Sequence, residues 1–191
     1  MRAALWQGKV DHHGHFYNVI ATLPRTSQIP ILISTLGKLA FQLAGQIADG
    51  ALTWVCPVPY LLHTGLPALR TSAAAVGRSP PPLVAHVLVA ITEDRHAVLA
   101  AGHQMLDFYA KIPFYANMFS NAGFSLTSDQ AIPDTLVDSL VISGDESTIT
   151  ARLTELLTAG LDELMVSLVR TTCAGDDDDE QTRLMQLIGR L

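Results

Sequence analysis

The sequence predicts an α/β protein built on a parallel sheet, and the clearest evidence lies in residues 30–55. Residues 31–33 are an uninterrupted apolar run, which is typical of a strand buried on both faces. From Lys38 onward the apolar residues recur at helical spacing, and a second apolar run at residues 51–55 follows a tight turn. Strand, short loop, helix, turn and strand form a βαβ unit, whose crossover we expect to be right-handed.

The rest of the chain continues this alternation. Apolar runs predict four strands, at residues 31–35, 51–55, 84–91 and 164–169. Helical spacing and capping residues predict helices at residues 38–48, 60–77, 92–110, 111–119, 133–142, 145–159 and 181–191. Thr92 and Asp145 are the expected N-caps of two of these helices. Before the first strand we expect the end of a helix at residues 1–8, a small hairpin with Gly14 at its tip, and a loop at residues 20–29.

The loop Ser34–Gly37 is the first candidate site, because it joins the carboxyl end of a parallel strand to the amino end of a helix. The first N–H groups of a helix have no partner within it, and the helix dipole adds partial positive charge, so a phosphate can dock there. Ser34 and Thr35 are candidate hydroxyl donors, and Gly37 allows an anion to approach the backbone. The alternative is that a hydroxyl residue only caps the helix and the glycine only eases the turn.

Composition and charge exclude several classes of protein. No apolar stretch approaches the roughly 18 residues of a membrane span, and the amino terminus lacks the apolar core of a signal peptide, so we expect a cytoplasmic protein that contacts no membrane. The net charge is −6 and the basic residues are scattered, which argues against nucleic acid as a partner. Cys56 and Cys173 follow no metal or redox spacing and are expected to be reduced thiols.

Three histidines and an aspartate in residues 11–17 invite a metal hypothesis. Metal sites need ligands that converge from fixed elements, and a solvated hairpin turn explains the same residues more simply. We therefore expect no metal site.

Three ordered segments resemble one enzyme family. The segment PILISTLGKLAFQLAGQIADGALTW, which begins at Pro30, resembles the signature of the luciferase-like flavin and deazaflavin oxidoreductases. The segment GKVDHHGHFYNV, from Gly8, is similar to the family's upstream Gly-x-Val-x-x-x-Gly-x-x-Tyr pattern, and Val87–Phe124 resembles its Val-x-x-Thr-x-Asp strand and helix. The resemblance spans roughly residues 8–169 and is strongest to the deazaflavin (coenzyme F420)-dependent branch.

The resemblance implies a (β/α)₈ TIM barrel, which typically needs about 250 residues, whereas this chain has 191. We therefore expect the carboxyl-terminal half of a barrel, a truncated domain with about four parallel strands. As a single partial domain it would comprise a helix end and hairpin in residues 1–29, the last four βα units in residues 30–175 with a helical insertion near 111–142, and a terminal helix in residues 176–191. An isolated half leaves two open sheet edges, which favours a homo-oligomer.

The function that the resemblance implies is hydride transfer between coenzyme F420 and a small organic substrate. The expected cofactor contacts are Ser34, Thr35, Leu36 and Gly37, with Trp54 either walling the cofactor ring or filling the core. Arg170, which leaves the last strand, and His86, within the third, are candidate contacts for an anion or substrate, or alternatively a surface arginine and a structural histidine. No catalytic acid or base can be named.

Two alternatives remain open at this level. An FMN-dependent luciferase-like monooxygenase would share the same loop and the same fold. A catalytically incomplete half barrel would act only as a binding or association module.

Overall fold

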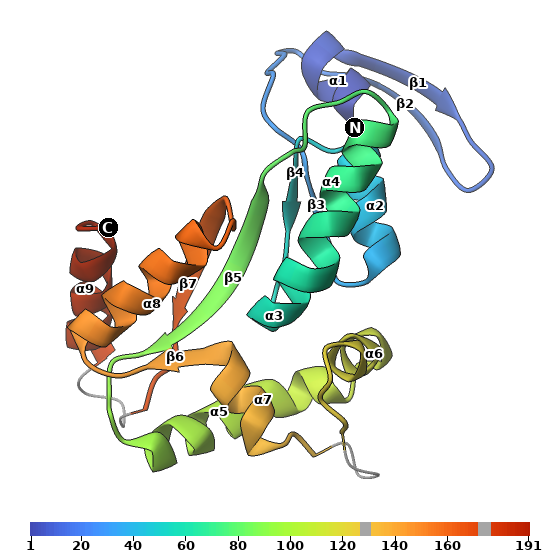
Figure 1. Ribbon diagram of the computed structural model, residues 1–191. Helices are drawn as coiled ribbons and strands as arrows, with labels where there is room; N and C mark the ends of the chain where they lie inside the picture. Colours follow the sequence, from blue (N-terminus) through green and yellow to red (C-terminus); the bar gives the residue numbers. More distant parts are fainter. Residues whose placement is uncertain (127–130, 172–176) are drawn as a thin grey trace. The chain divides into compact units, whose positions relative to one another are not determined.

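The computed structural model describes residues 1–126, 131–171 and 177–191, except for the side chains of residues 177 and 178. The chain divides into two compact units, Met1–Leu32 and Ile33–Leu191 (Figure 1). Whether the two units form the predicted single domain stays a prediction. Cys173 lies outside the described residues.

The first unit is a short helix followed by a hairpin. Helix α1 (Arg2–Gln7) ends at Gly8, whose φ of 72° lies in the left-handed region that favours glycine. Strands β1 (Lys9–His13) and β2 (Asn18–Thr22) pair in antiparallel register. The N–H of Gly14 donates to the carbonyl of Tyr17 at 2.9 Å across the turn, which confirms the predicted hairpin. Strand β2 extends into the residues predicted to be a loop.

The second unit is organised around strand β5. Its sheet consists of β3 (Leu32–Ser34), β4 (Gly50–Leu52), β5 (Leu83–Ala90), β6 (Val141–Ser143) and β7 (Glu163–Leu168). Strand β7 pairs with one edge of β5 along residues 84–89, so the two other partners of β5 must share its opposite edge. There β4 pairs near the start of β5 and β6 near its end, and all three pairings are parallel. The predicted parallel sheet is confirmed, with β6 as an added strand.

Strand β6 corrects the predicted helix at residues 133–142. Helix α7 (Asp134–Leu140) stops at Leu140, and the next three residues pair with β5 beyond the end of β4. Val141 and Ile142 are β-branched and suit a strand, and the backbone groups of β5 that β4 does not reach give them partners.

The predicted helix at residues 60–77 is built from three pieces. They are α3 (Val58–Tyr60), the π-helical turn η1 (Leu61–Gly65) and α4 (Leu66–Ala75). Pro67 has no N–H to donate to the preceding turn, which gives a physical reason for the change of helix type.

The other helices follow the predicted order, with one corrected cap. They are α2 (Lys38–Ile47), α5 (Arg95–Ala110), α6 (Pro113–Asn121), α8 (Glu146–Thr158) and α9 (Asp177–Ile188). The N-cap of α5 is Asp94 rather than Thr92, because the Asp94 carboxylate accepts the N–H groups of His96 and Ala97. Asp145 caps α8 as predicted, and its bonds from Thr148 and Ser147 lower the pKa of its carboxyl.

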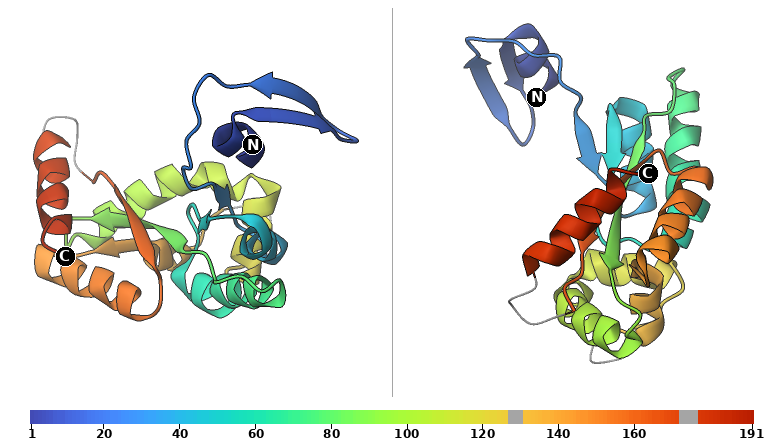
Figure 2. Two further views of the ribbon diagram at one scale, coloured as in Figure 1. Left: turned by 90° about the horizontal axis from the view of Figure 1, so that it is seen from above. Right: turned by 90° about the vertical axis from the view of Figure 1, so that its left-hand side faces the viewer.

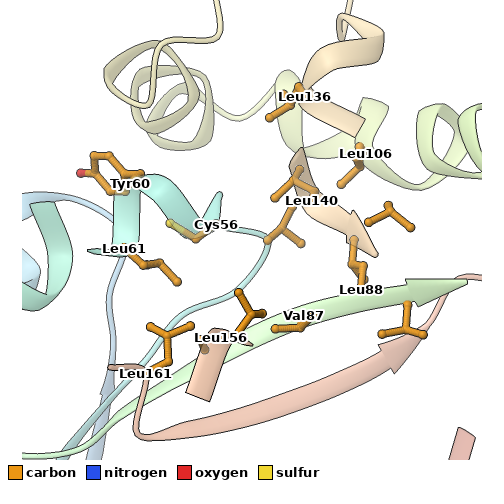
Figure 3. Close-up of a cluster of buried hydrophobic side chains, with 14 of the residues drawn as sticks. Cys56, Tyr60, Leu61, Val87, Leu88, Leu106, Leu136, Leu140, Leu156 and Leu161 are labelled. Carbon is orange, nitrogen blue, oxygen red and sulfur yellow. The ribbon is translucent and has the colours of Figure 1, made fainter. Parts of the chain in front are cut away.

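The core of the second unit lies where these helices meet the sheet. Figure 3 shows leucines of α5, α7 and α8 gathered around β5, among them Leu106, Leu136, Leu140 and Leu156. In the right-hand view of Figure 2, α4 and α8 lie on the same side of β5. No helix in the described parts of the chain combines the length and the apolar character that a membrane span needs.

Helices α2 and α4 are in unusually close contact. A Cβ atom added to Gly45 would lie 2.2 Å from Ser72 Oγ and 2.3 Å from the carbonyl oxygen of Leu69. Only glycine allows this approach, so the packing of α2 against α4 requires glycine at position 45.

Candidate functional site

The loop after β3 is tied to the end of β4 by Thr35. The N–H of Thr35 donates to the carbonyl of Leu52 at 2.8 Å, and its hydroxyl lies 3.3 Å from the same oxygen. Thr35 is buried, whereas Ser34 is exposed and Leu36 packs partly against the core. The hydroxyl of Thr35 therefore bonds the loop to the end of β4. Ser34 is left as the accessible hydroxyl of the loop.

The amino terminus of α2 has no side-chain cap. Gly37 is its N-cap, with extended backbone (φ −85°, ψ 156°), and its carbonyl accepts the N–H groups of Ala40 and Phe41. The preceding N–H groups, of Lys38 and Leu39, have no acceptor within the helix. A Cβ atom at Gly37 would meet nothing within 4 Å, so neither packing nor backbone conformation requires glycine here.

Trp54 lies at the carboxyl end of β4, stacked on His86 of β5. The two ring centroids are 3.8 Å apart and the planes differ by 4°. Leu52 pairs with Val84, so the residues two positions further along, Trp54 and His86, face the same side of the sheet. The indole Nε1–H donates to the hydroxyl of Tyr109 on α5 at 2.8 Å, and 38% of Trp54 is exposed.

His86 is held in one tautomer by two hydrogen bonds. The backbone N–H of Val55 lies 3.2 Å from Nδ1, and since an N–H can only donate, Nδ1 is an acceptor. The proton of the neutral ring then sits on Nε2, which lies 2.9 Å from Ser167 Oγ on β7. Burial lowers the pKa of His86 to about 4, so the ring is neutral at pH 7.

Val55 adopts a strained backbone conformation beside this network. Its φ of 50° is positive, which is rare for a β-branched residue and costs on the order of 1–3 kcal/mol. Strain of this kind persists where the surroundings hold it, and it clusters at functional sites. Here the strained residue presents its N–H to His86 and directly follows Trp54.

A cavity lies along the middle of β5, where both His86 and Val87 line it. Its volume is about 590 Å³, and it opens beside the stretch of β5 that separates the pairing of β4 from that of β6. Its apolar walls include Cys56, Val58, Leu62, Val87, Leu140 and Leu156. Trp54 and the Ser34–Gly37 loop do not line it.

Cys56, which lines this cavity, is a buried free thiol. Its sulfur lies 3.7 Å from the sulfur of Met118, and burial raises the pKa of the thiol, so it carries no thiolate at neutral pH. Tyr115, also buried, has its pKa raised to about 12.

Arg170 lies beside α5. It is exposed and borders a hollow of about 400 Å³ together with Gln104 and Met105 of that helix. The structure thus brings the Ser34–Gly37 loop and Trp54 to neighbouring strand ends, stacks Trp54 on His86 in the middle of β5, and places Arg170 next to α5.

The histidine-rich hairpin contains one ion pair, between Asp11 and His13, whose Oδ1 and Nε2 atoms are 3.0 Å apart. Within the described residues no three histidine, cysteine or acidic side chains gather as metal ligands do.

The sequence analysis did not identify three residues that bond to the stacked pair of Trp54 and His86. Val55 and Ser167 bond to His86, and Tyr109 bonds to Trp54. Ser167 interrupts an apolar strand, which is a weak signal of an inward polar contact. Tyr109 sits among other aromatic residues, so nothing in its local sequence separates it from core packing.

Comparison with known proteins assigns the chain to a family. The sequence model of the luciferase-like monooxygenase family matches residues 1–163. No match was found among curated protein sequences.

Solved structures show the same fold at low sequence identity. An F420-dependent secondary alcohol dehydrogenase, in complex with an F420–acetone adduct, is 15% identical with a TM-score of 0.66, over 87% of this chain and 52% of that one. The F420-dependent tetrahydromethanopterin reductase of Methanopyrus kandleri is 19% identical with a TM-score of 0.62. The match covers 87% of this chain and 54% of the reductase. Riboflavin lyase with a modified FMN is 16% identical with a TM-score of 0.58, over 95% and 48%.

The chain thus spans about half the length of these structures, which confirms the prediction of a partial (β/α)₈ barrel. The family match confirms the resemblance carried by the residue 30–54 segment. This chain belongs to the luciferase-like monooxygenase family.

Proposed function

We propose that the chain takes part in hydride transfer between coenzyme F420 and a small organic substrate, with the coenzyme held at the carboxyl ends of β3 and β4. The observation that carries the proposal is the pairing of two features at adjacent strand ends. One is the uncapped amino terminus of α2 at Gly37, and the other is the accessible indole of Trp54. The bond from Thr35 to Leu52 fixes these strand ends side by side.

These residues fit a cofactor with an anionic group and a fused ring. The N–H groups of Lys38 and Leu39 and the hydroxyl of Ser34 are donors for phosphate oxygens, and Gly37 leaves room for them. Trp54 offers an aromatic surface to the ring. When bound, the deazaflavin supplies the hydride chemistry, and the protein binds and orients it.

The remaining predicted contacts have separate places in the proposal. Leu36 contributes apolar surface beneath the loop, and Arg170 is a contact for an anionic part of the substrate. Both ring nitrogens of His86 are engaged by the protein, so a direct contact between His86 and substrate stays a prediction. So do the homo-oligomer and the cytoplasmic location.

The second candidate is an FMN-dependent monooxygenase. The family name and the riboflavin lyase with its modified FMN support it, and FMN also carries a phosphate and a related ring. The third candidate is a half barrel that binds or associates without catalysis.

A titration distinguishes these candidates. The purified chain is titrated with coenzyme F420 and, separately, with FMN, and binding is followed by fluorescence. We expect saturable binding of F420 that is weakened at least about tenfold by Gly37→Asp, because a carboxylate at the helix terminus repels the phosphate.

Gly37→Ala is the matched control. The open space at Gly37 accepts a methyl group, so this variant should bind as the wild type does. Tighter binding of FMN would favour the monooxygenase. Binding of neither cofactor would mean that this chain alone does not carry the proposed activity.

A further inference from the structure

We propose that Tyr109 and His86 are positioning residues that hold the Trp54 indole as a rigid platform for the fused ring of a flavin or deazaflavin. The inference rests on the proposed function. It adds the identity of the side chains that order the ring-binding surface in the absence of a ligand.

The indole is fixed by two contacts of different kinds. The parallel stack on His86, at 3.8 Å between centroids, sets the plane of the ring. The hydrogen bond from Nε1 to the Tyr109 hydroxyl, at 2.8 Å, sets its rotation within that plane. A tryptophan side chain has two rotatable angles, and the two contacts together leave neither free.

The two holding residues are themselves fixed. His86 is held by Val55 on one ring nitrogen and by Ser167 on the other. Tyr109 packs edge-to-face on Tyr115, with centroids 4.9 Å apart, and Tyr115 is buried. Both residues that contact the indole therefore have fixed positions. His86 is held within the sheet, and Tyr109 of α5 is held against Tyr115 of α6.

The exposure of Trp54 separates this arrangement from ordinary core packing. Core aromatic residues of the same unit, Phe41 and Phe119, are fully buried, whereas 38% of Trp54 remains accessible. Ordering a partly accessible tryptophan has an entropic cost that partial burial offsets less than full burial does. The same ordering favours binding of a planar ligand, because the ring surface no longer has to be organised upon association.

The test follows the fluorescence of Trp54 alone. The chain has two tryptophans, so Trp6→Phe in the full-length chain leaves Trp54 as the single reporter. The probe is riboflavin, with phosphate-free deazariboflavin as a second arm, because neither carries the phosphate that the helix terminus is proposed to bind.

We expect riboflavin to quench Trp54 saturably. Tyr109→Phe keeps the ring but removes the acceptor of the indole N–H. It should lower the fluorescence anisotropy of Trp54 and weaken riboflavin binding about three- to tenfold. Tyr115→Phe is the matched control, because it leaves the bond between Trp54 and Tyr109 in place.

His86→Asn is a second, independent variant. Its amide oxygen can still accept the N–H of Val55, so the strand end is kept while the stacking ring is lost. We expect lower anisotropy of Trp54 here as well.

Two results would overturn the inference. One is equal anisotropy and affinity in the Tyr109→Phe and Tyr115→Phe chains. The other is no quenching of Trp54 by either phosphate-free ring, even where F420 or FMN binds. Quenching by riboflavin without binding of F420 or FMN would support the platform and contradict the proposed function, so the two failures are distinguishable.

Discussion

The two ends of α2 differ in what they contact, although one βαβ unit builds both. Toward its carboxyl end, Gly45 lies so close to α4 that a single added carbon would overlap Ser72 and Leu69. At its amino end, Gly37 faces open space and the helix has no side-chain cap. Packing explains the first glycine and leaves the second without a structural reason. The comparison shows that close packing requires glycine at one end of α2 and not at the other.

The largest effect is expected from Gly45→Ala. The new methyl group would press on backbone as well as on a side chain, so the free energy of unfolding should fall by about 3 kcal/mol. Thermal unfolding should then show a melting temperature lower by roughly 6–12 °C. Gly37→Ala is the control and should change the free energy of unfolding by less than about 0.5 kcal/mol. Equal melting temperatures for the two variants would refute the contrast between the ends of α2.

The next largest effect on stability concerns His86 of β5 and depends on pH. The pKa of His86 is lowered by burial from 6.5 to about 4, so between these values the unfolded chain binds a proton that the folded chain does not. The neutral ring therefore makes its full contribution to the free energy of unfolding above about pH 6.5. This contribution is lost as the pH falls toward 4.

We therefore expect the free energy of unfolding to drop by about 2 kcal/mol more in the wild type than in His86→Asn between pH 7 and pH 4.5. Urea unfolding at both pH values measures this difference. Parallel losses in the two proteins would show that His86 is not the group that titrates.

The smallest effect separates two neighbouring hydroxyls. Thr35→Val removes a buried hydroxyl that bonds to Leu52, and should cost about 1 kcal/mol of unfolding free energy. Ser34→Ala, at an exposed position of the same loop, should cost less than about 0.5 kcal/mol and act on cofactor affinity instead. Denaturant titration of both variants would settle the point, and a larger loss from Ser34→Ala would reverse the roles assigned here.

Much of the sheet was predictable because its signals are local. The strands at residues 31–35, 51–55, 84–91 and 164–169 lie within a few residues of β3, β4, β5 and β7, since continuous apolar runs and turn residues mark them. The hairpin around Gly14 and the Asp145 cap follow from short-range chemistry in the same way.

The wrong or missing predictions concern features that depend on contacts between segments far apart in the sequence. Strand β6 exists because β4 leaves part of the edge of β5 unpaired, a fact that depends on the register of distant segments. Thr92 and Asp94 are both good caps, and the path of the backbone decides between them. The stack of Trp54 on His86 and the bond to Tyr109 join three elements, so a sequence could nominate Trp54 and His86 but not their contact.

The position of β5 in the sheet also has a consequence for synthesis of the chain. Its first residue, Leu83, donates its N–H to Asp162, 79 residues further along, at the start of the segment that becomes β7. At about 5–20 residues per second, a ribosome needs roughly 4–16 s to make that stretch. During this interval one edge of an eight-residue apolar strand has no partner within the growing chain. The nascent polypeptide therefore needs protection from aggregation at β5.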